Sequence, residues 1–253
     1  MRRSSQTPLK SPLVQGGTIS AHEVRRMRLS HEVRLVRLRL PCLLFTILLV
    51  LTLARGRIDA EQTISLRPNL NGPDALAEWS LDGSGSWTVT DGKLVLGKAG
   101  TPAGSIRRPA ALAILKTEPL KRVSLMVELR STAPREVLRR DLNLVFGYQS
   151  PSRFYYVHLS GVTDAVHHGI FLVADADRRR IDDGKGEPQL KDQNWHRVRL
   201  ERDGLTGRIE IYVDGSKAPV LAASDTTIRA GQVGLGSFDD TGEFRQIQVT
   251  GSK

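Results

Sequence analysis

Cysteine is almost absent from this chain of 253 residues, which contains only Cys42. Cys42 lies near the start of an apolar run, so the chain beyond residue 60 has no thiol. This excludes a disulfide framework, a thiol nucleophile and a thiolate metal site from that part of the chain. A lipid-attachment cysteine would follow the apolar run, so its position also argues against lipidation. Residues 61–253 must therefore depend on a hydrophobic core, and a domain of about 190 residues can bury one.

An excess of basic residues is also lacking beyond residue 60. The whole chain has a formal net charge of +10, but residues 1–60 hold 11 Lys and Arg against 3 acidic residues. The remainder holds 26 basic and 24 acidic residues, a formal charge of +2. A large positive net charge would indicate non-specific binding to nucleic acid or to membranes. Because the basic character belongs to the first 60 residues, we predict no nucleic-acid partner.

The one long apolar run, residues 40–54, follows three arginines within residues 34–39. A basic stretch, an apolar run of roughly 7–15 residues and a small-residue cleavage site form a signal peptide, and Ile58-Asp59-Ala60 supplies such a site. A spanning helix needs about 20 apolar residues. We therefore predict cleavage and a secreted, periplasmic or cell-envelope location. The alternative is an uncleaved signal anchor, which would be the protein's only contact with a membrane.

Three segments are expected along the chain. Met27 begins a leader of ordinary proportions, so we predict that residues 1–26 are a non-native or disordered extension. Residues 27–60 are then the signal peptide, and residues 61–253 form a single domain with no internal linker.

Sustained helical periodicity is missing from residues 61–253, which instead show short alternating runs between turn residues. "GSWTVTDGKLVLG" holds two such runs around Asp91-Gly92, a strong hairpin signal. "VSLMVELRS" alternates apolar and polar residues, and "GRIEIYVDG" does the same before a turn at Asp214-Gly215. Trp195 begins another run and is expected to cover one end of the core. This pattern predicts an all-β antiparallel sandwich.

Two stretches resemble a known superfamily. "WHRVRLERDGLTGRIEIYVDG" followed by "GQVGLGSFDDTGEFRQIQV" resembles the C-terminal half of laminin G-like domains in the concanavalin A-like lectin/glucanase superfamily. "WSLDGSGSWTVTDGKLVL" resembles the opening of the bacterial 3-keto-disaccharide hydrolase domain family. Together the resemblance covers about Trp79 to Thr250. It implies a jelly-roll β-sandwich that holds a glycan on its concave sheet face.

A hairpin of "DLNLVFGYQ" and "RFYYVHLSG" is predicted around Ser150-Pro151-Ser152. A four-residue loop pairs Tyr148 with Tyr155, which gives one apolar face directed to the core. In the other register, shifted by one residue, the two faces exchange and Leu144 lies against His158. The favoured register continues with Phe146 opposite Val157 and Leu144 opposite Leu159. The opposite face then collects polar and aromatic side chains, namely Asp141, Asn143, Tyr156 and His158.

This polar and aromatic face is the candidate glycan site. Aromatic rings cover the apolar faces of sugars, and Asn, Asp and His bond their hydroxyls. The ligand-binding candidates are therefore Asn143, Tyr156 and His158, with His167 and His168 on the next strand. Because His167 and His168 are adjacent in a strand, they point to opposite sides and at most one joins the face. The alternative interpretation is a set of half-exposed sheet residues satisfied by their neighbours.

Catalysis has a weaker basis in the sequence. Glycoside hydrolysis uses two carboxyl groups about 5–9.5 Å apart. Glucanases of the superfamily carry Glu-x-Asp-x-Glu or a close variant on one strand, and this chain lacks it. The catalytic candidates are His158 as a base and Asp141 as an acid paired with a loop carboxyl group. We therefore expect glycan binding. A saccharide-active hydrolase of the 3-keto-disaccharide type and an envelope adhesion or structural module are the alternatives.

Calcium is the one cofactor for which the sequence offers ligands. Asp239 and Asp240 in "SFDDTGE" could supply the hard oxygen atoms that calcium prefers, although the spacing is not that of an EF-hand loop. The laminin G-like resemblance also implies calcium. The alternative is a solvated loop without an ion.

Overall fold

The computed structural model describes residues 62–101 and 104–253. The predicted extension, signal peptide and cleavage site lie outside the described residues. The described residues fall within one compact unit, Asp59–Lys253. Their only helical element is a short 3-10 turn, η1 (Ala75–Glu78). Among these residues, no helix has the length and apolar character needed to span a membrane.

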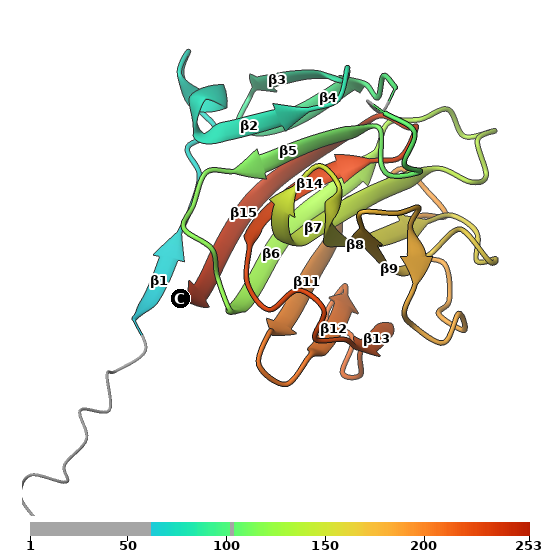
Figure 1. Ribbon diagram of the computed structural model, residues 1–253. Helices are drawn as coiled ribbons and strands as arrows, with labels where there is room; N and C mark the ends of the chain where they lie inside the picture. Colours follow the sequence, from blue (N-terminus) through green and yellow to red (C-terminus); the bar gives the residue numbers. More distant parts are fainter. Residues whose placement is uncertain (1–61, 102–103) are drawn as a thin grey trace, which may run out of the picture. The chain divides into compact units, whose positions relative to one another are not determined.

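Within the described residues, fifteen strands form two antiparallel sheets that stack as two layers (Figure 1). Sheet A has eight strands in the order β13-β12-β11-β6-β15-β4-β3, with β1 beside β15. Sheet B has seven strands in the order β10-β9-β8-β7-β14-β5-β2. The predicted all-β antiparallel sandwich is confirmed, and neighbouring strands that are distant in sequence give it the crossovers of a jelly roll.

The bounds of the strands are as follows. Sheet A contains β1 (Thr63–Leu66), β3 (Ser86–Thr90), β4 (Lys93–Lys98), β6 (Arg122–Ser131), β11 (His196–Asp203), β12 (Arg208–Val213), β13 (Leu221–Ser224) and β15 (Gly242–Ser252). Sheet B contains β2 (Trp79–Asp82), β5 (Ala111–Leu115), β7 (Asp141–Ser150), β8 (Arg153–Ser160), β9 (Gly169–Ala174), β10 (Arg179–Arg180) and β14 (Gln232–Ser237).

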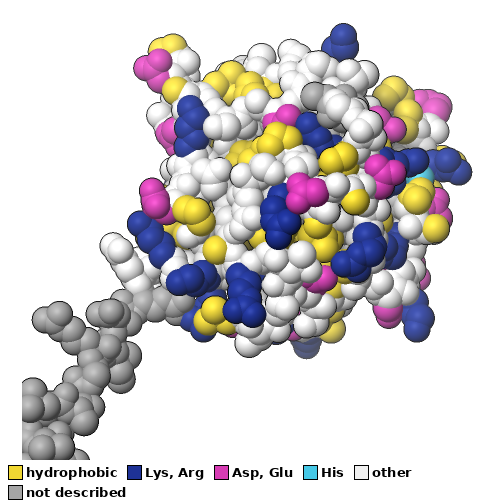
Figure 2. Space-filling view, viewed as in Figure 1, with side chains coloured by type: hydrophobic (Ala, Val, Ile, Leu, Met, Phe, Trp, Pro, Cys, Tyr) yellow, Lys and Arg dark blue, Asp and Glu magenta, His cyan; other side chains and the backbone are white. Residues whose placement is uncertain are grey.

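The main core lies between the sheets and follows the alternation of the sequence. In β6 the buried side chains are Val123, Leu125, Val127 and Leu129, and the residues between them face outward. Successive side chains of a strand point to opposite faces, which is why a two-residue period buries one side. Basic and acidic side chains are interspersed over the face seen in Figure 2, in keeping with the small net charge beyond residue 60.

Sheet B is buried on both faces. Its outer face carries a second apolar cluster that includes Leu112, Phe154 and Phe171, against which Ile106 packs. The segment around Ile106 is tied down at Arg107, whose backbone N–H donates to Asp177 Oδ1 (2.8 Å) and whose carbonyl accepts from Arg178 (3.1 Å). The chain before β5 and the chain after β9 therefore close together over this face.

The β7–β8 hairpin differs from the predicted register by two residues. Ser150 pairs with Arg153, as a four-residue loop requires, but Tyr155 lies opposite Phe146 and not opposite Tyr148. A bulge between Phe146 and Ser150 causes the shift, and Gly147 within it has φ +60°. The pairing of Tyr148 with Tyr155 is therefore wrong. Because the shift is even, the residues before the bulge keep their predicted faces. Tyr148, beyond the bulge, does not: it lies on the outer face, with its ring 5.7 Å from that of Phe154.

Trp195 also differs from the expectation that it covers the core. It is half-buried, and the guanidinium groups of Arg130 and Arg245 lie 4.8 and 4.0 Å from its ring centroid. Cation–π contacts of this kind contribute about 0.5–1 kcal/mol at exposed sites. Trp195 thus belongs to the outer face of sheet A.

Candidate functional site

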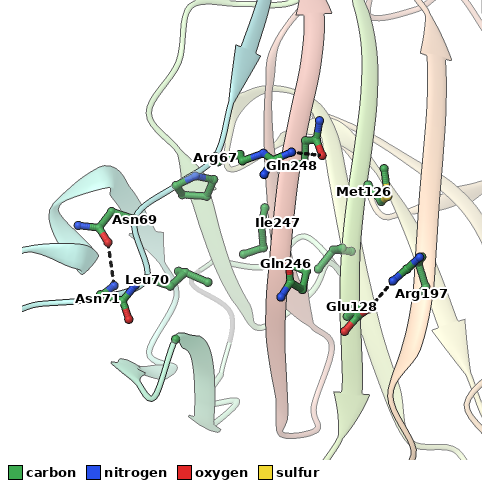
Figure 3. Close-up of a pocket in the computed structure, with 13 residues that line it drawn as sticks. Arg67, Asn69, Leu70, Asn71, Met126, Glu128, Arg197, Gln246, Ile247 and Gln248 are labelled. Atoms are coloured by element: carbon green, nitrogen blue, oxygen red, sulfur yellow. Dashed lines mark hydrogen bonds and ion pairs between the residues drawn. The ribbon is translucent and has the colours of Figure 1, made fainter.

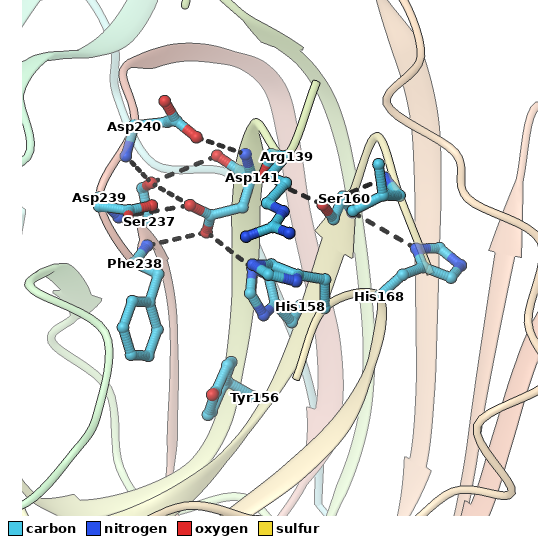
Figure 4. Close-up of polar contacts among 12 residues, drawn as sticks. Arg139, Asp141, Tyr156, His158, Ser160, His168, Ser237, Phe238, Asp239 and Asp240 are labelled. Atoms are coloured by element: carbon cyan, nitrogen blue, oxygen red, sulfur yellow. Dashed lines mark hydrogen bonds and ion pairs between the residues drawn. The ribbon is translucent and has the colours of Figure 1, made fainter. Parts of the chain in front are cut away.

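The predicted polar residues meet at one end of sheet B (Figure 4). Asp141 begins β7 opposite Ser160, and His158 lies near the end of β8 opposite Asn143, two pairs further along the hairpin and on the same face. The turn after β14 brings residues 237–240 against Asp141. We call this set, Asp141, His158 and residues 237–240, the Asp141 cluster.

The Asp141 carboxylate is fully buried and holds the turn after β14. It accepts hydrogen bonds from the backbone N–H groups of Phe238 (2.8 Å) and Asp239 (3.3 Å) and from Ser237 Oγ (3.1 Å). In return, Asp240 Oδ2 accepts from the Asp141 N–H (2.9 Å). Burial raises the pKa of Asp141 well above its ordinary value, and the charges of Asp239 and Asp240 raise it further. The cluster is therefore a buried group of polar side chains, connected by hydrogen bonds, at one end of the strands of sheet B.

His158 lies beside this carboxylate as a neutral imidazole. Burial, followed by the nearby charge of Arg178, holds the pKa of His158 well below its ordinary value. Its Nε2 lies 3.4 Å from Asp141 Oδ2 and has no hydrogen bond among the described residues. Because the ring is neutral and the distance is long for a hydrogen bond, this is a weak polar contact and not an ion pair. The ring of Phe238 stacks on the imidazole of His158, with the two ring centroids 5.9 Å apart.

Arg178 covers the polar face from outside. Its Nη1 donates to Tyr156 Oη (2.9 Å) and lies 3.3 Å from His158 Nδ1. Its guanidinium carbon lies 4.2 Å from the Phe238 ring centroid and 5.0 Å from that of Phe171. Burial raises the pKa of Tyr156, so its hydroxyl stays protonated. Arg178 is itself half-buried, so one guanidinium separates the buried polar side chains from solvent.

The adjacent histidines do diverge. The ring of His167 lies 5.6 Å from that of His158, and its Nδ1 is 2.8 Å from the Asp164 carboxylate. Although burial opposes it, hydrogen bonds from Val166 and His167 lower the pKa of Asp164 to about 2. His168 instead faces Ser160, whose N–H donates to its Nδ1 (3.3 Å). Only His167 therefore reaches the side where His158 lies.

The structure brings Asn143, Tyr156 and His158 together on one face, but this face is not open. All three side chains are at most 1 % exposed, and Asn143 lies directly opposite His158 in the β7–β8 pairing. The expectation that these side chains are exposed on the sheet surface is therefore wrong, because Arg178, Phe238 and the segment before β5 cover them. A ligand at this end would first meet Arg178 and Phe238.

Arg178 and Phe238 are the residues that sequence reasoning missed. Arg178 stands in an arginine triplet that reads as a turn surface, and Phe238 is a single aromatic between a glycine-rich strand and two acids. Arg178 lies directly before β10 and Phe238 directly after β14, where the two-residue period no longer predicts the direction of a side chain. The isolated aromatic beside the predicted acids was the one available signal.

Three carboxylates of the Asp141 cluster could hold a metal ion. One oxygen from each of Asp141, Asp239 and Asp240 lies within 4.8 Å of the others. All are hard oxygen ligands of the kind calcium prefers. Burial raises the pKa values of Asp141 and Asp240, because it makes their charged forms less favourable. A bound cation would compensate them, so the residues present fit such an ion.

Comparisons with known proteins give structural matches only. No family model matches the chain, and no curated protein matches it. A carbohydrate-binding module, CBM66 from Bacillus subtilis, is 17% identical with a TM-score of 0.51, over 68% of this chain and 94% of that module. The acidic lectin of winged bean, complexed with methyl-α-D-galactose, is 15% identical with a TM-score of 0.50, over 76% of this chain and 99% of the lectin.

A third match is the exoplasmic/lumenal domain of VIP36 in its Ca²⁺-bound form, at 13% identity and a TM-score of 0.48, over 75% of this chain and 90% of that domain. At these identities the first two matches establish the fold alone. The described residues therefore have the concanavalin A-like jelly-roll fold, to which the folds of this carbohydrate-binding module and this lectin are similar.

Proposed function

We propose that this chain is an exported glycan-binding protein whose ligand lies over the outer face of sheet B, at the end formed by Arg178 and Phe238. The observation that carries the proposal is the array in which Arg178 lies between two aromatic rings and bonds Tyr156 and His158. The likeness in fold to a carbohydrate-binding module and a lectin supports it. Export is expected from the basic and apolar leader.

The array suits a sugar for two reasons. Phe238 is half-buried and offers apolar ring surface, while Arg178 and the exposed Arg107 near the same ring offer guanidinium donors. Guanidinium groups present several fixed N–H donors that match hydroxyl and carboxylate oxygens. In this proposal Tyr156 and His158 position Arg178 from below, and His167 forms part of the rim. Asn143 and His168 support the sheet without touching the ligand.

The test is binding of the purified full-length protein to a glycan array, followed by calorimetry with the glycans that bind. Arg178→Met removes the guanidinium while keeping much of the side-chain volume, and Phe238→Ala removes the ring. Arg178→Met is expected to weaken binding about tenfold or more, since a charge-assisted hydrogen bond contributes about 1.5–3 kcal/mol. Phe238→Ala is expected to weaken binding because the apolar ring surface offered to the sugar is lost. Arg179→Met is the matched control, because Arg179 is the exposed next residue and contacts neither ring.

Two results would contradict the proposal. One is the absence of any glycan ligand, with and without added calcium. The other is unchanged affinity in both Arg178→Met and Phe238→Ala while the variants unfold at the wild-type temperature.

We further propose that calcium binds at Asp141, Asp239 and Asp240. An ion that binds only the native state raises the unfolding temperature as its concentration rises. The expected result is a higher melting temperature in calcium than in chelator for the wild-type protein and no difference for Asp239→Asn. Asp239 is exposed, so this substitution leaves the core intact. Equal melting temperatures for the wild-type protein in calcium and in chelator would rule out this site.

A saccharide hydrolase is the second candidate, favoured by the contact of His158 Nε2 with Asp141 Oδ2 at 3.4 Å and the lack of another partner for Nε2. Both atoms are buried, so a substrate could reach them only after Arg178 and Phe238 moved. Turnover of a 3-keto-disaccharide by the wild-type protein, lost in His158→Gln with folding retained, would identify an enzyme. No turnover, with glycan binding retained, would leave the binding function.

A further inference from the structure

A polar pocket of about 590 Å³ opens on the outer face of sheet A, on the other side of the core from the Asp141 cluster (Figure 3). It is lined by residues 67–71 after β1, Gly92, residues 126–128 of β6, Arg197 of β11 and residues 246–248 of β15. Sites for small ligands commonly enclose about 300–1,000 Å³. The pocket thus has room for a small oligosaccharide, and none of its residues belongs to the site proposed on sheet B.

A bulge in β15 forms one wall of the pocket. The pairing of β15 with β6 shifts between Arg245 and Gln248, and Gln246 within the bulge has φ +52°. Bulges re-aim side chains and are frequent beside functional sites. A residue other than glycine with positive φ is uncommon and costs backbone energy. Here the bulge leaves Ile247 buried as a floor and turns Gln246 outward, exposed, at the pocket.

The segment after β1 forms the opposite wall. The side chain of Asn69 accepts a hydrogen bond from the backbone N–H of Asn71 (2.9 Å), and the Asn69 N–H donates to the Glu78 carboxylate (3.2 Å). These bonds fix the turn, and Leu70 is buried beside Ile247 at the base of the pocket. The walls are therefore held in place without a ligand.

The side chains that line the pocket can form many hydrogen bonds. They include four amides, of Asn69, Asn71, Gln246 and Gln248. The amide groups of Asn71 and Gln246 have no hydrogen-bond partner within the part of the chain that the structure describes. An amide both donates and accepts, which is what the hydroxyl groups of a sugar require. An apolar base beneath a ring of amides therefore suits a polyhydroxylated ligand.

The charged side chains in the pocket indicate which charge its ligand carries. The Glu128 carboxylate is bonded by Arg197 (2.9 Å) and Arg245 (2.9 Å), so its charge is compensated. Arg67 donates only to the neutral amide oxygen of Gln248 (3.3 Å), and no carboxylate of the described residues lies within 4.0 Å of it. One guanidinium without a counter-ion matches one carboxylate, with which it forms a pair of parallel hydrogen bonds.

We propose that this pocket binds an oligosaccharide that contains a uronic acid, as a second ligand site independent of the function proposed for sheet B. Arg67 bonds the uronate carboxylate, and the amides of Asn71 and Gln246 bond the ring hydroxyls. The bulged backbone of β15 and the turn at Asn69 hold these groups in place.

The experiment uses the full-length protein and two trisaccharides, trigalacturonate and its fully methyl-esterified form, in which neutral methyl esters replace the charged carboxylates. Titration calorimetry is expected to show binding of the acid and binding weaker by about tenfold or more for the ester. Arg67→Met is expected to weaken binding of the acid by a similar factor and to leave binding of the ester unchanged. Arg229→Met is the matched control, because Arg229 is exposed and lies outside both sites.

Arg178→Met separates this proposal from the one for sheet B, and it is expected to leave trigalacturonate binding unchanged. The proposal is overturned if trigalacturonate does not bind or if the ester binds as tightly as the acid. It is also overturned if Arg67→Met has no effect, or if the loss of binding occurs in Arg178→Met and not in Arg67→Met. Thermal unfolding of each variant confirms that the exposed substitution leaves the fold intact.

Discussion

At the scale of single residues, several buried polar groups depend on one or two specific hydrogen-bond partners, and loss of such a partner is expected to destabilise the protein. Tyr155 illustrates this. Its ring lies in the core, stacked on Phe146, and its hydroxyl donates to Asp225 Oδ1 (2.5 Å) while accepting from the Ile228 N–H (3.0 Å). One hydroxyl therefore joins sheet B to the loop that follows β13.

Removal of this hydroxyl should destabilise the protein. In Tyr155→Phe the buried Ile228 N–H loses its partner, which costs about 1–3 kcal/mol. Tyr212→Phe is the control, because Tyr212 is half-buried at the surface and bonds only Glu210 (2.9 Å), and a change within about 0.5 kcal/mol is expected. Urea unfolding measures both. Equal free energies of unfolding for the two variants would show that the Tyr155 hydroxyl is not a structural link.

His168 makes stability depend on pH. Burial lowers the pKa of His168 to about 4, whereas a histidine in an unfolded chain titrates near about 6.5. As the pH falls below 6.5 the unfolded chain binds the proton first, so stability decreases until the native pKa is reached. Between pH 7 and pH 5 this loss is about 2 kcal/mol. Asp141 acts in the opposite direction, because its raised pKa makes the native state bind a proton more readily.

The comparison of wild type with His168→Asn isolates the contribution of His168. Asparagine tolerates the positive φ of this position (+49°) and can accept from the Ser160 N–H, but it does not titrate. Urea unfolding at pH 7 and pH 5 should therefore show a smaller loss of stability in the variant. The same loss in both proteins would mean that His168 is protonated in the native state at pH 5.

At the scale of elements, glycine allows the strands of sheet B to bend and approach. Gly147 sits in the β7 bulge with φ +60°, and Gly231, before β14, lies against it so closely that a Cβ would be 2.2 Å from the Gly147 carbonyl carbon. The bulge thus depends on two glycines that are distant in sequence.

Gly147→Ala should weaken the β7–β8 hairpin. An L-residue in this left-handed conformation costs about 1–2 kcal/mol, and the new Cβ would lie 3.2 Å from Tyr155 Cδ2. Gly97→Ala in β4 is the control, since its φ is ordinary and its nearest neighbour would be 3.9 Å away. Thermal unfolding should show a clear loss for the first and little change for the second. A loss of the same size in both would argue against strain at the bulge.

At the scale of the whole molecule, the core separates two proposed ligand sites on opposite outer faces. Sheet A carries the pocket at Arg67, and sheet B carries the array at Arg178. The two sites share no residue. Substitutions at distant sites without shared partners usually add, and ligands without a shared conformational change do not couple.

Binding at the two faces is therefore expected to be independent. Saturation of sheet B with its glycan should leave the affinity for trigalacturonate unchanged. In the double variant Arg67→Met/Arg178→Met, the free energy of binding each ligand should change by the sum of the changes in the two single variants. Calorimetry with one ligand present in excess measures this. An affinity change of about tenfold, equal in both directions as linkage requires, would instead reveal a connection through the core.

The sequence predicted much of the fold and less of the candidate site. Alternation in β6 and β12 correctly assigned inward and outward residues, because a two-residue period survives whatever the strand pairs with. The face shared by Tyr156, His158 and Asn143 followed from the same period. The hairpin register did not follow from this period. A bulge at Gly147 adds residues to β7, and no feature of the apolar pattern in the sequence marks it.

What the sequence by itself determined is the class of the fold and the face of the residues in regularly alternating strands, since both depend on local alternation and turn chemistry. Only the tertiary structure decided what covers each face. Arg107 meets Asp177, 70 residues away, and Arg178 closes over Tyr156. The wall of the sheet A pocket likewise brings Arg67 to Gln248, 181 residues away. Contacts between such distant segments depend on how the two sheets stack, and they leave no periodic trace in the chain.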